Sequence, residues 1–201
     1  MGKKWALKLF IVLGMYLYVL FQAVMFMTLF PEVQEKCRKE INEEIGIKPP
    51  TIDDVQKLPY VMATLMEIQR MAIVAPGSLP HILMKDININ GYQFNKGTIF
   101  TANLSKFQMD PDVFPKPNLF NPERFIDGNG KARKIEQLVP FGIGKRICMG
   151  ETLARNQMFI FFVRMLQRIS FEETSNKPNI HNVIYGVTWI PKPFEVKILM
   201  K

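Results

Sequence analysis

The sequence predicts a mainly α-helical fold with small β-sheets, and three observations support this class. Residues 31–46, 60–71 and 151–169 carry apolar side chains at the three- and four-residue spacing of helices that pack on one side. The Asn-Gly pair at 90–91 is a strong signal for a two-residue hairpin turn. The chain has 201 residues, of which 48% are apolar, so it can bury a sizeable core.

The N-terminal segment is an apolar run. Residues 9–30 contain no charged side chain, and three lysines precede them. This length is sufficient to cross a bilayer. We expect a hydrophobic N-terminal helix at residues 1–30, followed by a separate region at 31–201. A membrane anchor and a helix buried in a protein core are both compatible with the pattern, and the topology stays open.

The next segment is expected to form a helix from Pro31 to Gly46. Its apolar stripe consists of Val33, Cys37, Ile41 and Ile45. We therefore interpret Cys37 as a buried free thiol. The chain has two cysteines, and no disulfide is indicated, which fits a reducing compartment.

Residues 60–71 are expected to form a helix with one apolar side, made of Val61, Leu65, Ile68 and Met71. Glu67 and Arg70 are three residues apart, so they share a helix face and can pair. On an exposed surface such a pair contributes only a few tenths of a kcal/mol. An isolated Glu-x-x-Arg is therefore weak support for any function.

Strands and loops are expected in the middle of the chain and at its end. Residues 86–100 resemble β-structure, with a second turn at Asn95-Lys96-Gly97. Residues 110–129 are irregular and contain the sequence Pro-Glu-Arg-Phe at 122–125. Residues 183–199 are expected to form a final strand pair around a Pro-Lys-Pro turn.

The last helix is expected at residues 151–169. Its apolar stripe is predicted to contain Leu153, Ala154, Met158, Phe161, Phe162, Met165, Leu166 and Ile169. Arg155, Arg164 and Arg168 fall off this stripe.

The segment before this helix has the chemistry of a thiolate site. It reads Phe-Gly-Ile-Gly-Lys-Arg-Ile-Cys-Met-Gly at residues 141–150. A thiolate is the form of cysteine that binds a metal, and the positive N-terminal end of the following helix favours a charged Cys148. Phe141 is expected to pack against the loop and shield the sulfur. A buried structural cysteine is the alternative.

Other residues of this loop suit a flat, anionic cofactor. Gly142, Gly144 and Gly150 permit unusual backbone angles and close approach of a ring. Arg146 carries a planar cation that suits a carboxylate such as a heme propionate.

These residues match the heme-binding signature Phe-x-x-Gly-x-Arg-x-Cys-x-Gly at all five fixed positions. A chance match is on the order of 10⁻⁷ to 10⁻⁶ per window. The chain thus resembles the cytochrome P450 family, with residues 23–201 similar to the C-terminal, heme-proximal portion of the fold in its microsomal, drug-metabolising branch. Within this resemblance, residues 23–30 correspond to core.

The resemblance also assigns roles outside the loop. In the family, a Glu-x-x-Arg helix and the arginine of Pro-Glu-Arg-Phe form a buried network, which here would consist of Glu67, Arg70 and Arg124. His81 falls where microsomal members place a propionate-binding histidine, and a surface or turn histidine is the alternative. Two segments, residues 74–81 and 181–190, are expected to face substrate.

The resemblance implies heme b, with Cys148 as axial ligand of the iron. It implies a monooxygenase that inserts one oxygen atom from O2 into a small apolar substrate, with electrons from an NADPH-dependent reductase, at the endoplasmic reticulum membrane. No catalytic residue is identified, because the family's acid–alcohol pair should fall at residues 11–16, where neither an acid nor a threonine stands. A truncated, inactive remnant that binds heme or a partner is the alternative.

The net charge is +8, from 26 lysines and arginines against 18 acidic residues. The basic residues are scattered, and no basic helix or basic-aromatic array is present. This pattern does not favour nucleic acid as a partner. It favours a solvated surface that could face anionic lipid or an acidic redox protein.

Overall fold

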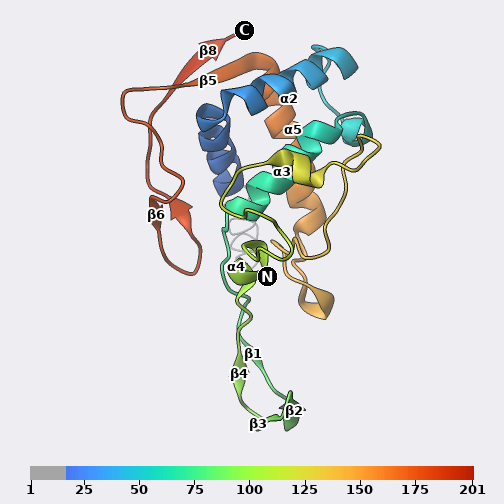
Figure 1. Ribbon diagram of the computed structural model, residues 1–201, viewed down its shortest axis with the longest axis vertical. Coiled ribbons are helices and arrows are strands. Elements are labelled where there is room, and N and C mark those ends of the chain that lie inside the picture. The colour runs from blue at the N-terminus through green and yellow to red at the C-terminus, as the bar shows by residue number, and fades with distance from the viewer. Residues whose placement is uncertain (1–16) are drawn as a thin grey trace, which may run out of the picture.

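The computed structural model describes residues 17–201 (Figure 1). Within these residues, four helices form the body: Leu17–Leu29, α2 (Pro31–Glu44), α3 (Pro59–Met71) and α5 (Glu151–Arg168). The shorter helical elements are η1 (Ile52–Lys57), α4 (Leu104–Gln108), η2 (Pro122–Phe125) and η3 (Gly144–Arg146). The strands in the described part of the chain form four two-stranded antiparallel sheets. The expected mainly helical class with small sheets is confirmed for this region.

The described part of the apolar run is a core helix. Ala23, Met25, Phe26 and Met27 are at most 2% exposed and belong to the main hydrophobic cluster. Among residues 17–201 no single helix is long and apolar enough to cross a bilayer. The helix Leu17–Leu29 and α2 reach that criterion only as a pair, and the two are bent by 108°. Residues 9–16 of the run lie outside the described residues.

Helix α2 begins and packs as expected. Pro31 occupies its first turn, where the missing amide hydrogen has no helical partner to lose. Val33, Cys37 and Ile41 are buried, and Ile45 is partly buried. Gly46 follows with a φ of 61°, a left-handed conformation that glycine adopts without strain. The buried position of Cys37 confirms its expected environment.

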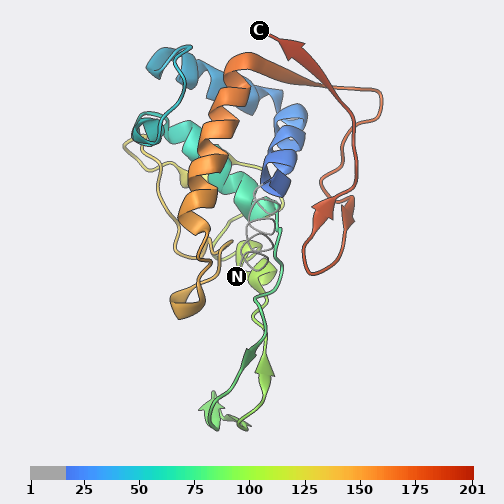
Figure 2. The ribbon, with the colours of Figure 1, turned by 180° about the vertical axis from the view of Figure 1, so that it is seen from behind.

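Helix α3 crosses α5 in the centre of the body and packs against both α2 and α5 (Figure 2). It was expected to have one apolar side, but all its residues from Ala63 to Arg70 are buried. A helix enclosed on all sides must place its polar groups against partners inside the protein. Its first turn is capped from α2, where the Glu40 carboxylate accepts hydrogen bonds from the amides of Tyr60 and Val61, each at 2.8 Å.

Helix α5 differs from the expected stripe. Leu153 and Phe161 are 47% and 51% exposed, whereas Phe159 and Val163, which the stripe omitted, are buried. Apolar residues occur on several sides of this helix, so spacing alone did not fix the buried face. The helix ends at Arg168, and Ile169, expected as its last residue, already belongs to a strand.

Residues 81–100 form an arm that extends away from the helical body (Figure 1). Strands β2 (Ile87–Ile89) and β3 (Tyr92–Phe94) make the expected hairpin, with Asn90 and Gly91 at positive φ. The turn at 95–97 leads into β4 (Ile99–Phe100), which pairs with β1 (His81–Ile82). The β-structure thus begins five residues before the expected start at 86.

The expected strand pair at residues 183–199 is only partly correct. Strand β6 (Val183–Ile184) pairs with β7 (Ile190–Pro191). After the proline turn, β8 (Val196–Met200) pairs instead with β5 (Ile169–Glu173). A side chain of α2 secures this sheet to the body, because the amide of Gln34 accepts from the backbone N–H of Phe171 and donates to its carbonyl.

Candidate functional site

A buried ion pair joins the two charged residues of α3. The Arg70 guanidinium donates from Nε to Glu67 Oε2 at 2.7 Å and from Nη2 to Glu67 Oε1 at 2.9 Å. Neither side chain is exposed. This fork-to-fork geometry aligns both donors with both carboxylate oxygens. The pair is therefore not an ordinary surface pair of an amphipathic helix.

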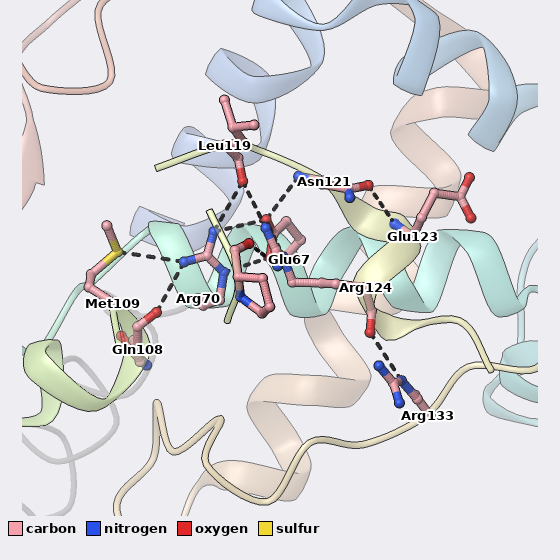
Figure 3. A network of polar contacts seen from close by, with 10 residues as sticks. Glu67, Arg70, Gln108, Met109, Leu119, Asn121, Glu123, Arg124 and Arg133 are labelled. Carbon is pink, nitrogen blue, oxygen red and sulfur yellow. Dashed lines mark hydrogen bonds and ion pairs between the residues drawn. The ribbon is translucent and has the colours of Figure 1, made fainter. Parts of the chain in front are cut away.

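Arg124, from η2, completes a three-residue network (Figure 3). Its Nε donates to Glu67 Oε1 at 3.0 Å, and its side chain is 8% exposed. The backbone N–H of Asn121 donates to the same oxygen at 2.9 Å. One carboxylate therefore faces two guanidinium groups and an amide, and these donors compensate its loss of water.

The remaining donors of the two arginines hold the irregular segment between α4 and η2. Arg70 and Arg124 both donate to the carbonyl of Leu119, at 3.3 and 3.2 Å. Arg70 also reaches the carbonyl of Gln108 at 3.0 Å, and Arg124 that of Pro115 at 3.1 Å. Figure 3 shows the carbonyls of Gln108 and Leu119 beside the guanidinium groups. The network fixes a stretch of chain that has few elements of its own.

The segment of residues 141–150, called the cysteine loop below, lies at the N-terminal end of α5 (Figure 2). The N–H of Cys148 donates to the carbonyl of Phe141 at 2.9 Å, which closes the loop. The carbonyl of Cys148 accepts from the N–H of Glu151, the first residue of α5, at 3.3 Å. Its thiol is exposed. The loop therefore presents the sulfur to the surface beside the positive end of a helix.

The three glycines of the cysteine loop differ in backbone conformation. Gly142 and Gly144 have φ values of 78° and 69°, and a Cβ added at either would meet no atom within 4 Å. Their requirement for glycine is therefore conformational, and the space beside them is open to a flat group. Gly150 caps α5 with a φ of −92°, so the expected need for an unusual backbone angle there is wrong.

Two further side chains of the cysteine loop, Arg146 and Phe141, lie in different environments. Arg146 is exposed in η3, and within residues 17–201 its side chain makes no hydrogen bond or ion pair. Phe141 is half-buried and packs with the cluster of Ala154 and Met158. Because Cys148 is exposed, the expected shielding of its sulfur by Phe141 is not met in this structure.

The second cysteine is excluded as a metal ligand by its surroundings. Cys37 is fully buried, with its Sγ 3.3 Å from Thr64 Oγ1. Burial raises the pKa of the Cys37 thiol to about 12, so it is protonated at neutral pH. Within residues 17–201 no three His, Cys, Asp or Glu side chains cluster as a metal site. Cys148 is thus the cysteine available for ligation.

Among residues 17–201, no hydrogen bond or ion pair joins His81 to the cysteine loop. His81 occupies β1 at the start of the arm, is exposed, and pairs through its backbone with Phe100. The two segments expected to face substrate do meet, because the N–H of Trp189 donates to the carbonyl of Val74 at 2.8 Å. This bond places the C-terminal hairpin beside the segment that follows α3.

Comparison with known proteins decides the family. The family model for cytochrome P450 matches residues 18–198. The chain belongs to the cytochrome P450 family. Cytochrome P450 2U1 of Homo sapiens is 40% identical over 178 residues, which is 87% of this chain and 32% of that protein. Cytochrome P450 2B12 of Rattus norvegicus is 42% identical over 175 residues, 86% of this chain and 36% of that protein.

A third relative carries a name that states an activity. The 3-ketosteroid oxygenase of Caenorhabditis elegans is 40% identical over 170 residues, covering 84% of this chain and 30% of that protein. The chain spans about a third of the length of these curated relatives. It is therefore a partial P450 domain, and its likeness to the 2U, 2B and 2D proteins confirms the expected branch of the family.

The cytochrome P450 motifs drew attention to Glu67, Arg70, Arg124 and the cysteine loop, but other polar residues of the site were missed. Gln69 in α3 accepts a hydrogen bond from Arg155 in α5, with Nη1 and Oε1 3.3 Å apart. Arg155 also pairs with Glu151 at 2.8 Å. The four-residue spacing of Glu151 and Arg155 could have predicted this ion pair, since residues four apart are neighbours on a helix. Nothing in the sequence indicated Gln69.

Proposed function

We propose that this P450 chain binds heme b through Cys148 as the axial thiolate ligand. The observation that carries the proposal is the exposed thiol of Cys148 in a closed loop at the positive end of α5. Glycine-rich loops offer amide donors that tune a metal-bound sulfur.

The neighbouring residues fit such a cofactor. The open space beside Gly142 and Gly144 allows a flat ring to approach the backbone. Arg146 has an uncommitted guanidinium, which suits an anionic propionate. His81 is proposed as a second propionate ligand from the arm. The Glu67, Arg70 and Arg124 network is proposed to hold η2 against α3, and it is given no role in binding the cofactor.

The activity proposed for the whole protein is that of a heme-thiolate monooxygenase. When bound, the heme supplies an iron at which O2 is activated for transfer of one oxygen atom, with electrons from an NADPH-dependent reductase. The residues of this chain would hold the ligand sulfur, neutralise the propionates and line part of the pocket. The segments around Val74 and Trp189 are proposed to face a small apolar organic substrate, and the endoplasmic reticulum membrane is the proposed location.

A second candidate function is a heme-binding or partner-binding protein without catalysis. The observation that favours it is the apolar surface of the cysteine loop, where Ile143 and Met149 are 70% and 93% exposed. Apolar residues exposed together are typical of surfaces that bind a partner or a ligand. The chain also spans about a third of its relatives, so much of the surface that would enclose a heme lies outside the matched region.

Heme titration of the purified chain tests ligation by Cys148. We expect heme uptake, and after reduction and addition of carbon monoxide a red-shifted, thiolate-type Soret band. The variant Cys148→Ala should lose this band. The matched control Cys37→Ala should keep it, because Cys37 is a protonated, buried thiol. A thiolate-type band that persists in Cys148→Ala would refute the proposed ligand.

A turnover assay separates the two candidates. The heme-loaded chain is supplied with an NADPH-dependent reductase, NADPH and an apolar test substrate, and the oxygenated product is quantified. Formation of a product that requires reductase and Cys148 supports the monooxygenase. A stable heme–thiolate chain without product under these conditions supports the binding protein.

A further inference from the structure

Arg155 connects three parts of the molecule that meet behind the cysteine loop. Its Nε pairs with Glu151 Oε1 at 2.8 Å, and its Nη1 donates to Gln69 Oε1 at 3.3 Å. Its guanidinium carbon lies 4.9 Å from the centre of the Phe141 ring. One side chain thus contacts the first residue of the loop, the first turn of α5 and the buried helix α3.

Two of these contacts, those with Phe141 and Glu151, restrain a residue that is itself hydrogen-bonded to Cys148. The carbonyl of Phe141 accepts the N–H of Cys148, and the N–H of Glu151 donates to the carbonyl of Cys148. Holding the Phe141 ring and the Glu151 side chain therefore restricts both ends of the segment that carries the sulfur. Arg155 reaches the cysteine only through these two neighbours.

The third contact ties this arrangement to the rigid centre of the protein. Gln69 is 4% exposed, and its Nε2 also lies 3.5 Å from Met158 Sδ. It sits in α3 directly before Arg70, whose guanidinium is locked in the buried network. A guanidinium suits this bridge, because it is planar, stacks on a ring and donates in several directions at once.

We propose that Arg155 is a positioning residue that fixes the cysteine loop against α3, so that the Cys148 sulfur is held in one place for its metal. The role rests on the proposed ligation by Cys148. It predicts that loss of the guanidinium loosens the loop while the rest of the fold stays intact. Because Arg155 is partly exposed, with 29% of its side-chain surface accessible, its removal leaves no large cavity.

Amide hydrogen exchange of the full, heme-free chain tests the proposal without the cofactor. In Arg155→Met we expect amides of residues 142–150 to exchange about tenfold faster, since the ion pair with Glu151, the hydrogen bond to Gln69 and the cation–π contact with Phe141 are lost. Exchange in β5 (Ile169–Glu173) should not change. Arg155→Lys keeps the charge but not the planar fork, so it should restore only part of the protection.

A matched control is available on the same helix. Arg164 donates to the carbonyl of Ile47 and to Gln167, far along α5 from the loop. Arg164→Met should leave the exchange of residues 142–150 at the wild-type rate. Equal exchange of the loop in Arg155→Met and wild type would overturn the proposal. So would an equal increase in the loop and in β5, which is the signature of a general loss of stability.

The spectrum of the heme-loaded chain gives an independent readout. At equal bound heme, the reduced, carbon monoxide-treated Arg155→Met variant should show a larger share of the thiol-type Soret band than wild type and Arg164→Met. Unchanged band shares would count against positioning of the sulfur. If the wild type takes up no heme, the proposed function fails, but the exchange result still decides whether Arg155 holds the loop.

Discussion

Arg70 and Glu67 form a doubly hydrogen-bonded ion pair in the centre of the protein, with neither side chain accessible to solvent. The pair spans a single turn of α3, yet its remaining hydrogen bonds reach Gln108, Leu119 and Asn121 in the chain beyond. An ion pair within one turn of a helix thereby fixes the position of a long irregular segment. Breaking the ion pair is costly because both groups are buried, and neither charge can recover its hydration when its partner is removed.

Arg70→Met should therefore destabilise the chain severely. Removal of one partner leaves the Glu67 carboxylate buried with fewer donors, and such changes cost roughly 3–5 kcal/mol. The exposed pair of Lys39 and Glu43 provides the contrast, since both its side chains are more than half accessible. Lys39→Met should change the free energy of unfolding by less than about 0.5 kcal/mol. Urea unfolding followed by circular dichroism measures both, and a similar cost for the two variants would contradict this assignment of energy to burial.

Arg124→Ala should lose heme incorporation, and not only activity. Arg124 holds η2 to Glu67 and to the carbonyls of Pro115 and Leu119, so its loss releases the segment that packs on α3. The control is Arg133, an exposed arginine that donates to the carbonyl of Arg124. Heme content per chain, measured after extraction of the pigment, should fall in Arg124→Ala and stay normal in Arg133→Ala. Normal heme content in both variants would remove the support for a structural network behind the site.

The helices of the body could be predicted because each carries its own local signal. The Pro31 start, the stripe of Val33, Cys37 and Ile41, and the Gly46 stop placed α2 within two residues of its observed end. In α5 the same reasoning failed, since Leu153 and Phe161 are exposed although they are apolar. Periodicity identifies a buried face only when the other faces are polar.

The pairing of the C-terminal strand depended on contacts that are distant in sequence. The sequence of β8 does not specify which strand edge it pairs with. In the structure it pairs with β5, which places Met200 opposite Ile169. The amide of Gln34 marks this sheet by bonding both backbone groups of Phe171, but nothing around Gln34 in the sequence indicates that partner. Similarly, the motifs predicted that Arg70 and Arg124 meet at Glu67. They did not predict which backbone carbonyls accept the remaining N–H groups of the two arginines.

Asp54 should make the chain sensitive to acid. Hydrogen bonds from Lys57 and from the backbone and side chain of Thr51 lower the pKa of the Asp54 carboxyl to about 2. A folded-state pKa below the unfolded value means that the ionised form stabilises the fold above about pH 4. This contribution is lost as the pH falls from about 4 toward 2.

Asp54→Asn isolates that contribution. The variant should be less stable than wild type at neutral pH, because the ion pair with Lys57 and part of the cap of η1 are lost. The difference between the two proteins should shrink as the pH falls from about 4 toward 2. Urea midpoints measured across this range test the expectation, and a difference that is constant with pH would show that Asp54 does not titrate with folding.

Glu40→Ala should weaken the junction of α2 and α3. The Glu40 carboxylate accepts both first-turn amides, from Tyr60 and Val61, in a helix whose own cap position is occupied by Leu58 and provides no side-chain acceptor. Removal leaves two partly buried N–H groups without a partner, at a cost of about 1–3 kcal/mol. Burial raises the pKa of Glu40, so the ionised carboxylate already bears a desolvation cost that the two amides offset only in part.

The neighbouring Glu43 supplies the control for this change. It lies on the same helix with 62% of its side-chain surface accessible, and it pairs only weakly with Lys39, at 3.9 Å. Glu43→Ala should therefore leave the urea midpoint almost unchanged, whereas Glu40→Ala lowers it. Amide exchange at Tyr60 and Val61 should rise in Glu40→Ala alone. If both variants are equally stable, the cap from α2 contributes nothing, and the start of α3 is held by Pro59 and core packing instead.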